Sequence, residues 1–236
     1  MERLDKFISN ATTLSRKDAR GAIKIGKVEV DGVVVKDFSK KVDTENSNIM
    51  LNGQAVKFNK TVYYMLNKPK GLLSASSDSK RKTVVDLIYE KYGRKDAFPV
   101  GRLDKDTTGL LIITNDGDFA HNVISPSKHI PKEYYVELDG EVTESVVAAF
   151  KNGVVLADGT KCLPAVLNVC ADNKCAANVV IEEGKYHQIK RMFGTQNLGV
   201  VELKRVRIGN LKLDVNLAQG DSRPLTEQEL QFVIKI

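Results

Sequence analysis

The chain has 236 residues, of which 42% are hydrophobic and 28% are charged, and its net charge is +6. This is the composition of an ordinary globular protein, and no apolar stretch reaches the length of a membrane span. Three cysteines without a C-x-x-C pair indicate reduced thiols in a cytoplasmic protein. The three histidines lack metal-ligand spacing, so we expect no metal site.

The excess positive charge is concentrated near the N-terminus. Residues 1–59 hold 11 Lys and Arg against 8 Asp and Glu, and residues 60–236 hold 25 against 22, so each part has a net charge of +3. A quarter of the chain therefore carries half of the excess charge. Such a concentration favours a polyanionic partner, although a solvated surface would have the same composition.

Residues 1–59 show the pattern of two short helices followed by small strands. Leu4, Phe7 and Ile8 recur at helical spacing, and Ser15 is the expected N-cap of a second helix. The basic residues of this second helix fall four positions apart on one stripe: Arg16, Arg20 and Lys24. Asp-Gly and Asn-Gly pairs between short alternating runs then predict small hairpins.

The remainder of the chain alternates strands with a few helices. The strand patterns cover residues 62–66, 110–113, 134–138, 166–169, 177–181 and 200–208, and the helical patterns cover residues 84–89, 144–150 and 189–193. Many strands without regular βαβ alternation argue for an α+β domain with a mostly antiparallel sheet. We therefore expect two domains, one of residues 1–59 and one of residues 60–236.

One acid stands at the start of a strand that is predicted to be buried on both faces. In Gly101-Arg102-Leu103-Asp104, the carboxylate precedes a Thr-Thr-Gly turn and the apolar run 110–113. A carboxylate in this place is held rigidly and half-shielded from water, which suits a nucleophile or a proton acceptor. Taken alone, such an acid more often caps a turn and pairs with a neighbouring base, here Arg102.

Four segments carry motifs in a fixed chain order. They are Lys68-Pro69-Lys70-Gly71, residues 101–113, Lys132-Glu133-Tyr134-Tyr135-Val136 and residues 183–193. This set resembles the RNA pseudouridine synthases, most closely the RsuA branch that acts on small-subunit ribosomal RNA. Residues 1–59 resemble an S4 RNA-binding domain, which also begins with an Arg-Leu-Asp-Lys-like string. The resemblance covers nearly the whole chain, and the synthase fold that it implies has a mostly antiparallel mixed sheet.

The resemblance implies a reaction and a role for three side chains. Pseudouridine forms when the bond from ribose C1′ to uracil N1 breaks, the base turns, and C5 bonds to C1′, an isomerisation that needs no cofactor. The family pattern gives Asp104 the attack on C1′ or the removal of the C2′ proton. In the same pattern, Lys190 keeps that acid ionised. Tyr134 stacks on the uracil and helps to remove the C5 proton. Tyr135, on the opposite face of the strand, and Arg191 are the alternatives.

Further basic residues are candidates for contacts with RNA. A uridine in folded RNA must leave its stack to reach a shielded carboxylate, so we expect base flipping. Arg102 would fill the vacated space or hold a phosphate, or else pair with a nearby acid. The candidates for a groove along the RNA backbone are Lys68, Lys70, Lys185, Arg205 and Arg207. Arg205 and Arg207 would share one strand face, because their spacing is two.

The leading hypothesis is an enzyme that isomerises one uridine of small-subunit (16S) ribosomal RNA, as a monomer bound to an assembly intermediate with ribosomal proteins. The choice of subunit rests on residues 186–193, since large-subunit relatives more often show Arg-Gln-Val-Arg-Arg-Met. The alternatives are a large-subunit (23S) enzyme of the same family and a non-catalytic RNA-binding assembly factor. A glycosidase with Asp106 as its second acid is disfavoured, because the other motifs are foreign to that class.

Overall fold

The computed structural model describes residues 1–12, 14–44, 46–56 and 61–234. By their internal contacts these residues form two units, Met1–Val62 with Val85–Ala97, and Tyr63–Val84 with Phe98–Ile236. The boundary that we predicted between residues 59 and 60 lies outside the described residues. No helix in the described ranges is long and apolar enough to cross a membrane.

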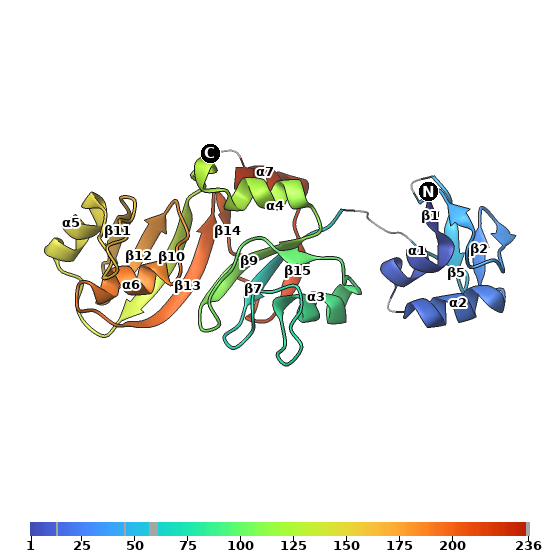
Figure 1. Cartoon of the computed structure of the whole chain (residues 1–236), viewed down its shortest axis with the longest axis horizontal. Coiled ribbons are helices and arrows are strands. Elements are labelled where there is room, and N and C mark those ends of the chain that lie inside the picture. The colour runs from blue at the N-terminus through green and yellow to red at the C-terminus, as the bar shows by residue number, and fades with distance from the viewer. Residues whose placement is uncertain (13, 45, 57–60, 235–236) are drawn as a thin grey trace. The chain divides into compact units, whose positions relative to one another are not determined.

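The first unit begins with two helices that pack over small sheets (Figure 1). The helices are α1 (Leu4–Ala11) and α2 (Arg16–Lys24), and the strands are β1 (Glu2–Arg3), β2 (Val28–Val30), β3 (Val33–Val34), β4 (Lys41–Val42), β5 (Ile49–Leu51) and β6 (Gln54–Ala55). Leu4, Phe7 and Ile8 are buried in its core, as their helical spacing predicts. The Ser15 hydroxyl caps α2 by accepting the N–H of Asp18 at 3.2 Å.

The second unit is built on one large sheet, whose strand order is β11-β12-β10-β13-β9-β7-β15, with β14 beside β13 and β8 beside β9. The strands are β7 (Tyr63–Lys68), β8 (Phe98–Pro99), β9 (Thr108–Thr114), β10 (Lys132–Leu138), β11 (Val166–Cys170), β12 (Asn173–Ile181), β13 (Val200–Ile208), β14 (Leu211–Lys212) and β15 (Ser222–Pro224). All described pairings in this sheet are antiparallel except that of β9 with β13. The predicted α+β class with a mostly antiparallel sheet is confirmed.

The helices after the first two are α3 (Val84–Tyr92), α4 (Gly117–Ile124), α5 (Glu144–Asn152), α6 (Gln188–Gly194) and α7 (Glu227–Ile234), with a short 3-10 helix at Pro126–Lys128. Helices α4 and α7 lie side by side (Figure 1), and Val123 and Val233 from them share one core with Met65 of β7. Helix α5 packs on α6 through Phe150 and Phe193, whose ring centres are 4.6 Å apart. Helix α6 also contacts β13, and α5 contacts β11, so the two helices hold each other against the sheet.

Strand β9 passes through the middle of the sheet, and all seven of its residues are buried. It matches the apolar run 110–113, from which we predicted a strand shielded on both faces. Gly109 lies opposite Arg205 of β13 with a φ of +98°, and a Cβ on it would lie 2.2 Å from the Arg205 carbonyl oxygen. The parallel contact of β9 with β13 therefore requires glycine at this position. The same contact fixes the position of the loop that precedes β9.

Candidate active site

The loop that precedes β9 carries Asp104 and is held by two neighbouring segments. The Ser74 hydroxyl donates to the Leu103 carbonyl at 2.8 Å and accepts the N–H of the same residue at 3.1 Å. The Gly71 N–H donates to the Lys105 carbonyl at 2.7 Å. The first motif turn is thus bonded to the Asp104 loop, which limits the freedom of the carboxylate.

Lys68 lies inside this arrangement rather than on the RNA groove that we expected for it. Its side chain is fully buried. Its ammonium donates to three backbone carbonyls, those of Pro69, Lys105 and Thr107, at 3.0, 3.3 and 3.0 Å. Burial lowers the pKa of Lys68 to about 8, although the carboxylates of Asp106 and Asp104 act in the opposite direction. The lysine therefore ties the first motif to the Asp104 loop and is not available to a phosphate.

Asp104 and Tyr134, which come from separate motifs, line the same pocket. The other lining residues are Arg102, Leu103, Thr107, Ile181, Gly184, Lys185, His187, Gln188, Ile189 and Leu203. The Asp104 side chain is 30% exposed, so it is half-shielded and still reachable from the pocket. The walls of the pocket combine apolar side chains with polar and charged ones, and polar groups in a pocket fix the orientation of a bound molecule.

Asp104 has a different partner from the one that we expected. The ammonium of Lys190 bonds to Asp106, and this hydrogen bond is the main reason that the pKa of Asp106 lies below its ordinary value. The group in contact with Asp104 is His187, whose Nε2 lies 3.4 Å from Oδ1. His187 precedes α6 with a φ of +47°, while Lys190 reaches the outer part of the loop. Arg191, the alternative to Lys190, bonds to the carboxylate of Asp158 and not to Asp104.

Tyr134 is buried and faces Arg205 on the neighbouring strand. The Arg205 side chain is also buried; its Nε donates to the Leu110 carbonyl at 2.7 Å, and its Nη1 lies 3.5 Å from the Tyr134 hydroxyl. Tyr135, the alternative to Tyr134, donates its hydroxyl to Glu137 at 2.8 Å and does not line the pocket. Arg205 therefore supports the tyrosine from within the domain instead of facing RNA.

A register shift in the pairing of β10 with β13 separates Arg205 from Arg207. Tyr134 lies opposite Arg205, but Glu133 lies opposite Arg207, so one extra residue is accommodated on β13. Consecutive residues of β10 point to opposite faces, and each arginine shares the face of its partner. Arg207 accordingly bonds to Glu133 at 2.6 Å, away from the pocket. The expectation that the two arginines share one face is wrong, because simple alternation fails at a bulge.

The other expected RNA contacts are nearer to the surface. Lys70 is half-exposed and pairs with Glu202, and Lys185 lines the pocket and pairs with Glu183. Arg102 is exposed, lines the pocket, and forms no ion pair with any described residue. The structural alternative for Arg102, a salt bridge to a nearby acid, is therefore not observed.

Comparison with known proteins agrees with this geometry. Residues 62–195 match the RNA pseudouridylate synthase family, and residues 2–49 match the S4 domain. The chain is 39% identical to ribosomal small subunit pseudouridine synthase A of Escherichia coli, over 98% of this chain and all of that protein. The chain belongs to the RNA pseudouridylate synthase family.

Two further relatives of this synthase are similarly close. An uncharacterized RNA pseudouridine synthase of Bacillus subtilis is 40% identical over 98% of each chain. A crystal structure of a pseudouridylate synthase aligns with a TM-score of 0.69 at 35% identity, covering 99% of this chain and all of that one. The enzyme class that we inferred from the four motifs is confirmed, and the non-catalytic factor is set aside.

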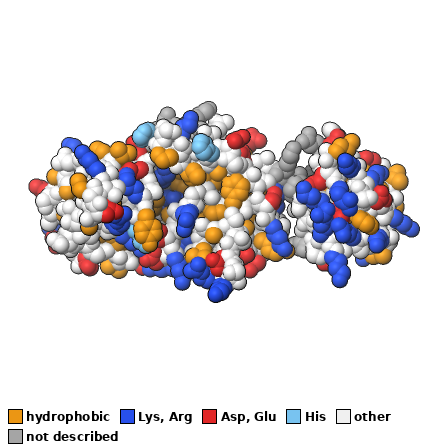
Figure 2. Space-filling view, in the orientation of Figure 1, with side chains coloured by type: hydrophobic (Ala, Val, Ile, Leu, Met, Phe, Trp, Pro, Cys, Tyr) orange, Lys and Arg blue, Asp and Glu red, His pale blue; other side chains and the backbone are white. Residues whose placement is uncertain are grey.

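The basic stripe of the synthase's S4 domain is arranged around a buried acid, Asp5. Three guanidinium groups contact its carboxylate, those of Arg3, Arg16 and Arg20, at 3.1, 3.4 and 2.7 Å. Burial alone would raise the pKa of Asp5, but the three hydrogen bonds outweigh it and hold the pKa well below its ordinary value. The Lys24 ammonium lies 5.4 Å from the centre of the Phe38 ring. Figure 2 shows Lys and Arg side chains gathered on this domain.

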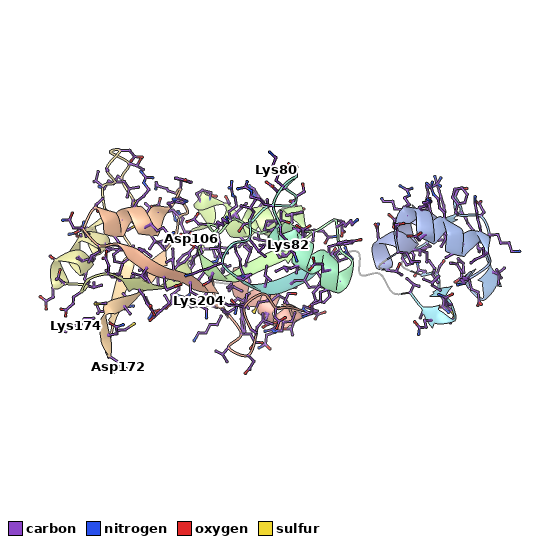
Figure 3. All side chains as sticks on the ribbon, turned by 90° about the horizontal axis from the view of Figure 1, so that it is seen from below. Lys80, Lys82, Asp106, Asp172, Lys174 and Lys204 are labelled. Carbon is purple, nitrogen blue, oxygen red and sulfur yellow. The ribbon has the colours of Figure 1, made fainter. Side chains whose placement is uncertain are left out.

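A basic loop and an aromatic side chain beside the pocket of the synthase were not predicted from the sequence. Lys80, Arg81 and Lys82 are exposed between β7 and α3, where Figure 3 shows Lys80 and Lys82 on their loop and Asp106 on the loop before β9. Arg81 and Tyr186 line a wider cleft that also contains Asp104. The run of three consecutive basic residues in a polar segment could have predicted the loop as an RNA contact. Tyr186 lies within residues 186–193, which we used only to choose the branch of the family.

Proposed function

We propose that this synthase converts one uridine of small-subunit ribosomal RNA into pseudouridine, with Asp104 as the carboxylate that acts on the ribose. The observation that carries the proposal is that Asp104 and Tyr134, from different motifs, line one half-shielded pocket. The subunit is supported by the identity over the full length with the small-subunit enzyme of Escherichia coli and by residues 186–193.

The proposed reaction needs the target uridine to leave its stack and enter the pocket. Asp104 then attacks C1′ or takes the C2′ proton, and either step breaks the bond from C1′ to N1. The detached uracil turns on the face of Tyr134 and bonds through C5, after which the C5 proton leaves and N1 regains a proton. The Tyr134 hydroxyl, held beside Arg205, is the group that we assign to this proton transfer.

The remaining parts of the proposal concern how RNA is held. Residues 1–59 act as the RNA-binding domain and residues 60–236 as the catalytic domain. Arg102 has no acidic partner among the described residues, which supports its role at the flipped nucleotide or on a phosphate. We place the enzyme, as a monomer, on an assembly intermediate, because a uridine inside a finished ribosomal subunit is less accessible than one in partly folded RNA.

Ribosomal RNA from cells that lack this protein should have lost one pseudouridine in the small subunit and none in the large subunit. Chemical mapping of pseudouridine, calibrated by mass spectrometry, measures both at once. Purified enzyme added to the deficient RNA should restore the same site, while the Asp104→Asn variant should not. Loss of a large-subunit pseudouridine instead would assign the enzyme to the other branch of the family.

Removal of the S4 stripe should weaken RNA binding through its electrostatic component. The variant replaces Arg16, Arg20 and Lys24 by Gln, and Arg3 remains as a partner for buried Asp5. We expect the slope of log Kd against log salt to fall by about one for each phosphate that the variant no longer neutralises. The measurement is RNA affinity from about 50 to 200 mM salt, with folding checked by circular dichroism.

A matched variant removes the same number of charges from exposed lysines of the second unit: Lys151, Lys161 and Lys174. Its salt dependence should stay close to that of the wild type. An equal decrease in the two variants would mean that the stripe acts only through net charge.

A further inference from the structure

We propose that the stacked side chains of Tyr186 and His187 form a binding platform for an unpaired RNA base that neighbours the uridine in the pocket. This inference rests on the proposed function and adds a second nucleotide subsite to it. The ligand class is a nucleobase held by its flat face, which every base offers without regard to sequence.

The two rings are already arranged as a stack. Their centroids are 3.9 Å apart and their planes differ by 17°. Tyr186 is 75% exposed, so most of its surface is free to accept another ring. Proteins that recognise single-stranded RNA stack unpaired bases on exposed aromatic rings of this kind.

The platform lies directly beside the reacting centre. His187 Nε2 is 3.4 Å from Asp104 Oδ1, and both rings line the cleft that contains this carboxylate. Four cationic side chains line the same cleft: Arg81, Arg102, Lys105 and Lys185. Arg81 pairs with Asp78 at 3.3 Å, whereas Arg102 has no acidic partner among the described residues and suits a phosphate beside a bound base. Among the described lining residues of this cleft, Tyr186 and His187 are the aromatic ones on which a nucleotide next to the flipped uridine could stack.

The segment is fixed before RNA arrives. His187 has a φ of +47° and a ψ of 36° at the start of α6. The Lys185 N–H donates to Gln188 Oε1 at 2.9 Å, and Arg191 Nη1 donates to the Tyr186 carbonyl at 3.3 Å. Extruding a uridine deprives its neighbour of a stacking partner, and a preformed ring stack replaces that partner without further ordering of the protein.

The chain contains no tryptophan, so a single Tyr186→Trp substitution introduces a unique fluorescent reporter. In an Asp104→Asn background, which holds the RNA without turnover, we expect saturating small-subunit RNA to quench its emission by about half or more, because stacked bases quench indole. The control is Val215→Trp, at a position that is 95% exposed and lines a different pocket; its emission should change little.

Labelled RNA anisotropy, recorded on the same samples, separates the two proposals. Binding of RNA without quenching of the Tyr186→Trp variant overturns the platform and leaves the proposed function standing. Absence of binding overturns both. Quenching in both tryptophan variants would show a non-specific effect and would also overturn the platform.

Steady-state kinetics test the same idea without a fluorophore. Tyr186→Ala should raise KM about tenfold, the equivalent of one missing base stack, with kcat within about twofold. Tyr186→Phe retains the ring and should behave as the wild type. If Tyr186→Ala leaves KM unchanged, or if Tyr186→Phe is as impaired as Tyr186→Ala, the ring does not bind a base.

Discussion

Replacement of Asp104 by Asn should abolish pseudouridine formation, with a loss of about 10⁴-fold or more in turnover, and should leave RNA affinity within about twofold. The amide has the shape of the carboxylate, but it can neither attack C1′ nor take the C2′ proton. Ser74 and Gly71 hold the loop by hydrogen bonds to the backbone carbonyls of Leu103 and Lys105, not to the Asp104 side chain. The substitution therefore leaves the loop in place. Release of tritium from RNA labelled at uridine C5 measures the reaction.

Asp106→Asn is the matched control, because it neutralises another acid of the same loop. That side chain is 65% exposed and bonds to Lys190, and it does not line the pocket. We expect it to lose less than about tenfold in turnover, as for a group that acts only through its surroundings. Substantial turnover by Asp104→Asn, or an equal loss in Asp106→Asn, would move the catalytic role away from Asp104.

Gly109→Ala should destabilise the catalytic domain by about 4 kcal/mol or more, which is in the range of severe single substitutions. The new Cβ would lie 2.2 Å from the Arg205 carbonyl oxygen, at a φ of +98° that alanine rarely adopts. The parallel contact between β9 and β13 would have to open. Urea unfolding monitored by circular dichroism gives the change in the free energy of unfolding.

Gly71→Ala separates the steric clash from the backbone strain. Its φ is +91°, but no atom lies within 4 Å of the place that a new Cβ would occupy. It should cost about 1–2 kcal/mol, which is the penalty for a left-handed backbone alone. Equal losses in the two variants would show that the close approach of β9 to β13 is not what requires Gly109.

The elements that follow local periodicity were predictable. The unbroken apolar run in 110–113 predicted the fully buried β9, and alternation correctly separated Tyr134 from Tyr135 on β10. Ser15 was recognisable as a cap because its neighbours are helical and its hydroxyl reaches a nearby N–H. In each case the decisive interaction joins residues close in sequence, so that a pattern within a short window contains it.

The arrangements that depend on distant residues were not predictable in this way. Lys68 is buried because carbonyls of the loop before β9 surround it, and its sequence neighbourhood carries no sign of that. The pairing of Lys190 with Asp106 joins residues 84 positions apart. The bulge on β13 reversed the expected face of Arg207, because an inserted residue shifts the alternation without any composition signal.

With the role that we propose for the S4 stripe, the Asp5 cluster would link RNA binding to the folding of the S4 domain. Arg3, Arg16 and Arg20 share the carboxylate of Asp5, and Asp37 also acts on Arg3, so the cluster keeps an excess of positive charge within a small volume. The mutual repulsion of these arginines opposes folding, and a polyanion that binds beside them would reduce it. A ligand that binds only the folded domain raises its stability by mass action, so we expect the melting temperature of this domain to rise with the concentration of RNA.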